Sequence, residues 1–150
     1  MTDFSPRLFA TDAEIRRVGM GLLDRTLPRA DWTHEAHLAA CLWIVAERPD
    51  IDPDCDLCGI ISGYNEAVGG VNDDTQGYHE TITRCFIHAV RLHLATASES
   101  ALAARVNALL LSPYGRRDWP LAFYSGETLF SVTARRRFIK PDLAPLPPLC

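Results

Sequence analysis

The amino-acid sequence predicts an all-α protein: a single helical domain over residues 1–150, built as an up-and-down bundle of about five to six helices. Three observations favour this fold class. Apolar residues recur three and four positions apart through most of the chain, which is the spacing of one helix face. No segment of useful length alternates polar and apolar residues, as a half-buried strand would. Capping residues, prolines and glycines divide the chain into segments of helical length.

Six segments carry these helical signals. They are expected over residues 12–23, 33–48, 52–68, 78–93, 98–112 and 127–138. The first begins at the capping box Thr11-Asp12-Ala13-Glu14. The second begins at Thr33, a good N-cap, and ends before Pro49. The third follows Asp52, with Pro53 at the first helical position, where its missing N–H does no harm.

The later helices are separated by loops and followed by a tail. Polar turn-forming residues fill the stretch 71–77 before the fourth helix. Ser98 is the predicted cap of the fifth helix, which ends before Pro113. Residues 140–150 contain four prolines and are expected to form an extended C-terminal tail.

Residues 113–125 are expected to form an aromatic-bearing loop. Its large side chains either pack in the core or fold over the end of the bundle as a lid, and they are Trp119, Phe123 and Tyr124. The charged residues Arg116, Arg117 and Asp118 in the same loop either orient an anionic ligand or pair with each other.

Composition excludes several classes of partner. The net charge of −4 and the pI near 5.7 disfavour nucleic acid, whose binding depends on lysine and arginine. No apolar run approaches the roughly 20 residues that span a bilayer, and the N-terminus does not read as a secretory signal. We therefore expect a cytoplasmic protein with no membrane partner, in which the five cysteines are reduced thiols.

Three of the five histidines fall in two short motifs, and each motif opens a predicted helix. Trp32-Thr33-His34-Glu35-Ala36-His37 starts the second helix, and Gly77-Tyr78-His79-Glu80-Thr81 starts the fourth. In an up-and-down bundle these two helices run parallel, so their N-termini lie at the same end. The sequence therefore predicts that His34, His37 and His79 converge on a divalent metal ion, with zinc, nickel or iron as candidates.

Glu80 directly follows His79 and is the candidate catalytic residue, as a fourth ligand or as the general base for a metal-bound water. The corresponding function is a metal-dependent hydrolase, or a related enzyme, that acts on a small molecule. An alternative remains open, in which the histidines cap helices by hydrogen bonds and need no metal. The protein is then a non-catalytic module that binds a small-molecule ligand or a partner helix.

Two further hypotheses have weaker support. Cys55 and Cys58 have the CxxC spacing of thiol chemistry, but no second pair and no preceding strand accompany them. Apolar helix faces are compatible with a homodimer, although no particular residue points to one.

The two histidine motifs, together with Tyr124-Ser125 and Lys140-Pro141-Asp142-Leu143, resemble those of a group of uncharacterised bacterial all-helical proteins. The likeness runs over most of the chain and implies a bacterial cytoplasmic protein, without implying a reaction. There is a looser architectural similarity to the DinB-type metal-binding bundles, which also gather three histidines at one end of a bundle. The histidine spacing differs from that expected of the DinB-type proteins.

Overall fold

The computed structural model describes residues 5–149, and within this range it contains helices and no strands, so the predicted fold class is confirmed. Met1–Phe4 and Cys150, the last residue of the predicted tail, lie outside the described residues. The α-helices are α1 (Asp12–Asp24), α2 (His34–Glu47), α3 (Pro53–Ala67), α4 (Glu80–Thr96), α5 (Leu102–Leu111), α6 (Gly126–Leu129) and α7 (Val132–Arg136). Short 3-10 helices are η1 (Arg29–Asp31), η2 (Pro113–Gly115) and η3 (Trp119–Ala122). No helix within residues 5–149 has the length and hydropathy needed to cross a bilayer.

The first three helices begin where the capping signals predict. Thr11 accepts a hydrogen bond from the backbone N–H of Glu14, and Thr33 accepts one from Ala36. Asp52 caps α3 by accepting from the N–H of Asp54. These bonds satisfy N–H groups that the first helical turn leaves without partners, and because they are local they can be recognised from the sequence.

Two of the later boundaries differ from the prediction. Helix α5 begins at Leu102 rather than near Ser98, because Asp12 of α1 accepts a hydrogen bond from the N–H of Ala103 at 2.7 Å and so caps α5 from another helix. The expected helix 127–138 is two short helices, α6 and α7. Ser131 interrupts it, because its hydroxyl accepts from the N–H of Ala134 and starts a new helix.

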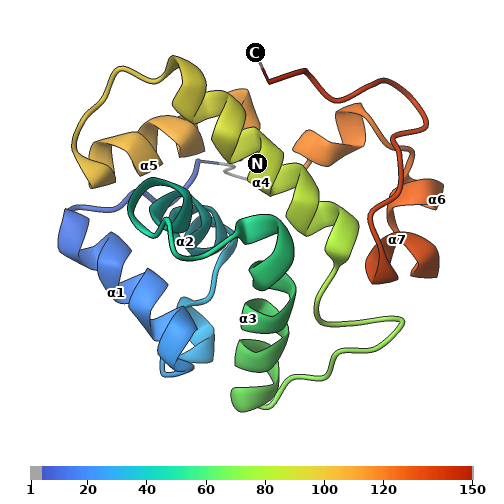
Figure 1. Ribbon diagram of the computed structural model, residues 1–150, viewed down its shortest axis with the longest axis horizontal. Coiled ribbons are helices and arrows are strands. Elements are labelled where there is room, and N and C mark those ends of the chain that lie inside the picture. Colours follow the sequence, from blue (N-terminus) through green and yellow to red (C-terminus); the bar gives the residue numbers. More distant parts are fainter. Residues whose placement is uncertain (1–4, 150) are drawn as a thin grey trace.

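Helix α2 is the centre of the bundle. Every residue from Leu38 to Ile44 is buried, so this helix is apolar all round rather than on one face. Helices α1, α3, α4 and α5 surround it (Figure 1). Figure 1 shows α2 almost end-on and α4 from the side, so the two axes cross steeply. The expectation that α2 and α4 run parallel is therefore wrong, because a helix buried on all sides is wrapped by its neighbours.

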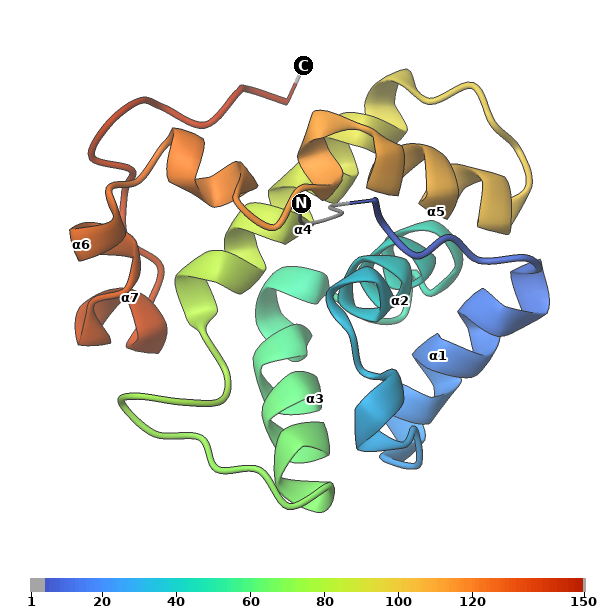
Figure 2. The same cartoon turned by 180° about the vertical axis from the view of Figure 1, so that it is seen from behind.

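Helices η3, α6 and α7 pack on the other side of α4 from α2 (Figure 2). Trp119 and Tyr124 are buried there against Cys85 and Leu129, so these aromatic residues belong to the core and do not form a lid. The tail is held by hydrogen bonds as well. The Tyr124 hydroxyl donates to the carbonyl of Ile139 at 2.6 Å. Asp142 accepts from the hydroxyl of Ser125 at 2.7 Å, so the Tyr124-Ser125 and Lys140–Leu143 motifs contact each other.

Candidate ligand-binding site

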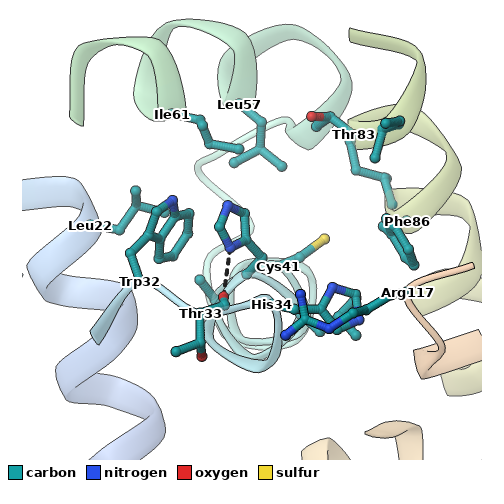
Figure 3. Close-up of a pocket in the computed structure, with 15 residues that line it drawn as sticks. Leu22, Trp32, Thr33, His34, Cys41, Leu57, Ile61, Thr83, Phe86 and Arg117 are labelled. Atoms are coloured by element: carbon teal, nitrogen blue, oxygen red, sulfur yellow. Dashed lines mark hydrogen bonds between the residues drawn. The ribbon is translucent and has the colours of Figure 1, made fainter. Parts of the chain in front are cut away.

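A cavity of about 490 Å³ lies beside the N-terminal turn of α2, between α3 and α4. Its walls are mainly apolar, and its lining residues are Leu22, Trp32, Thr33, His34, His37, Leu38, Ala40, Cys41, Leu57, Ile61, Ile82, Thr83, Phe86, Ile87 and Arg117. Figure 3 shows Leu57 and Ile61 entering it from α3, and Thr83 and Phe86 from α4. Its volume is typical of a site for a small molecule.

His37 is a polar residue of the cavity whose ring is held by a hydrogen bond and by an aromatic contact. Its Nδ1–H donates to the carbonyl of Thr33 at 2.7 Å (dashed line in Figure 3). The indole of Trp32 stacks on the imidazole with 3.7 Å between ring centroids and 31° between ring planes. No residue in the range 5–149 forms a hydrogen bond with the other nitrogen, Nε2. Thr33 and Trp32 therefore fix the ring and leave Nε2 available to a ligand.

His34 is held through the other ring nitrogen, Nε2. Its Nε2–H donates to the carbonyl of Gly115 at 2.8 Å, which ties the start of α2 to η2. The ring of Phe86 meets the imidazole edge-on, with 5.4 Å between centroids. A Cβ atom at position 115 would lie 2.5 Å from the carbonyl oxygen of Leu109, so glycine is the residue that fits between His34 and the end of α5. His34 thus forms part of the cavity wall while also anchoring the chain.

Both cavity histidines are held neutral by their surroundings. The cavity lets solvent reach His37, but the surrounding side chains desolvate its ring and lower its pKa to about 4. Burial also lowers the pKa of His34, and the charge of Arg117 acts in the same direction. Desolvation raises the pKa of Glu35, but backbone hydrogen bonds and Arg117 outweigh it, so the net pKa is lowered. Glu35 is therefore ionised beside two neutral imidazoles.

Arg117 is the cation of the site. Its charge acts on His34, whose pKa it helps to lower, and its nearest carboxylate is Glu35 at 4.0 Å. The neighbouring Arg116 instead pairs with Asp118 at 2.9 Å, so these two residues are pairing partners, as one of the two interpretations predicts. Arg117 alone of this group lines the cavity.

The structure does not bring His79 to His34 and His37. His79 is buried at the start of α4, outside the cavity lining, and both of its ring nitrogens are engaged. Nδ1 accepts from the N–H of Ile82 at 3.1 Å, and Nε2–H donates to the carbonyl of Leu129 at 2.8 Å. His79 is therefore a helix cap that also attaches α6 to α4.

Glu80 likewise makes contacts outside the cavity. One carboxylate oxygen accepts from the hydroxyl of Tyr78, and the other forms an ion pair with Arg84 at 3.0 Å. Arg84 in turn lies 3.6 Å from Asp54, so Glu80 belongs to a charged network that joins α4 to the start of α3. Within residues 5–149, no group of three or more His, Cys, Asp or Glu side chains has an arrangement that could hold a metal ion.

The remaining residues of the second motif also have structural roles. Thr81 is fully buried, and its hydroxyl donates to the carbonyl of Arg137 at 2.9 Å. Gly77 has a φ of +84°, and its carbonyl accepts from Arg135 of α7 at 3.0 Å. The whole Gly77–Thr81 segment therefore joins α4 to α6 and α7, whereas the Trp32–His37 segment lines the cavity.

The four cysteines in the described part of the chain form a buried pair and an exposed pair. Cys41 and Cys85 are buried, and burial raises the pKa of each thiol to about 12, so both are unreactive core residues. Cys55 and Cys58 lie on the exposed side of α3. The hydrogen bond with Asp52 and the nearby negative charges raise the pKa of Cys55, which disfavours the thiolate needed for thiol chemistry.

The sequence pointed to three of the cavity's polar residues, His34, His37 and Arg117, but not to its apolar walls. Ile61, Ile82 and Phe86 fit the apolar stripes of α3 and α4 and therefore look like ordinary core residues. No local pattern distinguishes an apolar side chain that faces a cavity from one that faces another side chain. Comparison with known proteins finds no matching family model, no matching curated protein and no matching solved structure.

Proposed function

We propose that this protein is a ligand-binding module whose cavity takes one small, mainly apolar molecule. One observation carries the proposal. The cavity combines apolar walls with two neutral imidazoles, and each imidazole uses only one of its nitrogens in a hydrogen bond to the backbone. A few polar groups placed in an otherwise apolar pocket are the usual means by which proteins orient a small ligand. Arg117 adds a cation at the same site.

A variant that fills the cavity tests this proposal. Ile61 lines the cavity from α3 and is only partly buried, so Ile61→Trp adds volume inside the cavity with limited disturbance of the core. Ile61→Leu conserves the volume and is the matched control. We expect saturable binding of 4-propylphenol, followed by NMR chemical shifts, in wild type and Ile61→Leu, and at least a roughly tenfold loss of affinity in Ile61→Trp. Equal affinity in all three proteins would place binding elsewhere and contradict the proposal.

A metal-dependent hydrolase is the second proposal. It is favoured by the presence of His34 and His37 in one cavity, where each has a nitrogen free of backbone hydrogen bonds. The third predicted ligand, His79, does not fit as arranged, because a metal would have to replace one of its two hydrogen bonds. Glu80 would also have to leave Arg84 to act as a base.

Metal analysis separates the two proposals. For protein purified without a histidine tag, then incubated with zinc, nickel or iron(II) and desalted, we expect less than about a tenth of an equivalent per chain, because no three His, Cys, Asp or Glu side chains in the described part of the chain are arranged to hold a metal ion. A full equivalent that is lost in both His37→Ala and His79→Ala would establish the three-histidine metal site and overturn the ligand-binding proposal. The control is His88→Ala, which alters a histidine outside the cavity.

A further inference from the structure

We propose that the ligand of this cavity is a neutral aromatic hydrogen-bond donor of the phenol class, whose O–H donates to Nε2 of His37. This inference rests on the proposed function, since it names the chemistry of the molecule that the cavity takes. It follows from the hydrogen that His37 carries, from the rings that surround it, and from the charges at the site.

The tautomer of His37 is fixed by its backbone contact. A carbonyl oxygen only accepts hydrogen bonds, so the 2.7 Å contact with the Thr33 carbonyl places the hydrogen on Nδ1. In a neutral imidazole the other nitrogen is then a bare acceptor. Nε2 can therefore be satisfied by a ligand that donates, and not by a ligand that only accepts.

The apolar walls make this requirement selective. A ligand that fills the cavity expels the water that otherwise solvates Nε2. If the ligand has no donor, the acceptor is left desolvated and unpaired, which is the expensive side of hydrogen-bond energetics. Sites built around a buried polar group reject ligands that lack its partner more strongly than apolar pockets discriminate by size.

The charged groups argue for a neutral ligand. Arg117 disfavours a cationic amine at the cavity. A carboxylate would meet the bare lone pair of His37 Nε2, and Glu35 lies 4.0 Å from Arg117 and already offsets its charge. The ligand is therefore expected to be uncharged at neutral pH, as a simple phenol is.

The aromatic body follows from the rings of the cavity. Trp32 stacks on His37, and Phe86 packs edge-on against His34, so flat aromatic surfaces stand beside the acceptor. Aromatic ligands gain stacked and edge-on contacts with such rings beyond the burial of area. A phenol supplies both the flat ring and a stronger O–H donor than an aliphatic alcohol.

Four matched probes test the inference with the intact chain at pH 7: 4-propylphenol, its methyl ether, propylbenzene and 4-propylbenzoate. They share one apolar body and differ in the polar group, and affinities come from NMR titration. We expect the phenol to bind at least about tenfold more tightly than each of the others. In His37→Phe the phenol should lose this advantage over its methyl ether. In wild type, the phenol alone should shift the ¹⁵N resonance of His37 Nε2, a readout that needs no variant.

The other outcomes overturn either the donor inference alone or the ligand-binding proposal as well. Equal affinity of the phenol and its methyl ether, or an unmoved His37 Nε2 resonance, overturns the donor inference while the ligand-binding proposal stands. Tightest binding of the benzoate overturns it in favour of carboxylate recognition by Arg117. No saturable binding of any probe overturns the ligand-binding proposal and the inference with it.

Discussion

His79→Ala is expected to lower the free energy of unfolding by about 2–3 kcal/mol, in two parts. Loss of the N-cap that accepts from Ile82 costs about 1 kcal/mol. Leaving the Leu129 carbonyl without the donor it has in wild type costs about 1–2 kcal/mol. For a chain of this size the sum corresponds to a fall in Tm of roughly 5–10 °C, measured by circular dichroism.

The matched control is His79→Asn. Asparagine is a good N-cap, so it retains the bond to the start of α4 but is too short to reach Leu129 as histidine does. His79→Asn should therefore recover about half of the stability that His79→Ala loses. A fall of less than about 0.5 kcal/mol in His79→Ala would show that the cap and the α6 contact contribute little.

Gly77→Ala is expected to be still more disruptive, at about 3 kcal/mol or more, for two independent reasons. Gly77 has a φ of +84°, which an L side chain rarely adopts. A Cβ atom would also lie 2.4 Å from the carbonyl oxygen of Val71 and 2.8 Å from the Cα of Asn72, and backbone atoms cannot move aside cheaply. The side chain of Asn72 holds the N–H of Tyr78 at 2.9 Å, so the whole loop before α4 should loosen.

Gly69 provides the control for this prediction. It also has a positive φ, of +90°, but a Cβ atom there would meet nothing within 4 Å. Gly69→Ala therefore isolates the backbone strain and should cost about 1 kcal/mol. Urea unfolding curves of the two variants measure the difference directly. Equal destabilisation would mean that the close approach of Gly77 to Val71 and Asn72 adds nothing to the cost of the substitution.

The parts of the fold that could be predicted from sequence are those with local causes. Thr11, Thr33 and Asp52 cap helices through residues two or three positions away, so the starts of α1, α2 and α3 follow from spacing alone. The start of α5 could not be predicted, because Asp12 supplies its cap from 91 positions earlier in the chain. The crossing of α2 and α4 likewise depends on how neighbours wrap a helix that is buried on all sides.

The same division applies to the candidate site. Residue types and spacing identified His34 and His37, and both line the cavity. His79 resembles His34 in its sequence context, because each stands at the start of a helix and is followed by a glutamate. Its role is instead set by Leu129, 50 positions away, whose carbonyl accepts a hydrogen bond from Nε2–H. Two histidine motifs of similar appearance therefore serve different ends.

The ¹⁵N spectrum of the imidazole nitrogens at pH 7 tests this assignment most directly, with each histidine assigned by its Asn variant. We predict neutral rings, with the hydrogen on Nδ1 in His37 and on Nε2 in His34 and His79, because each hydrogen donates to a backbone carbonyl. A cationic His37, or a His37 that carries its hydrogen on Nε2, would contradict the account.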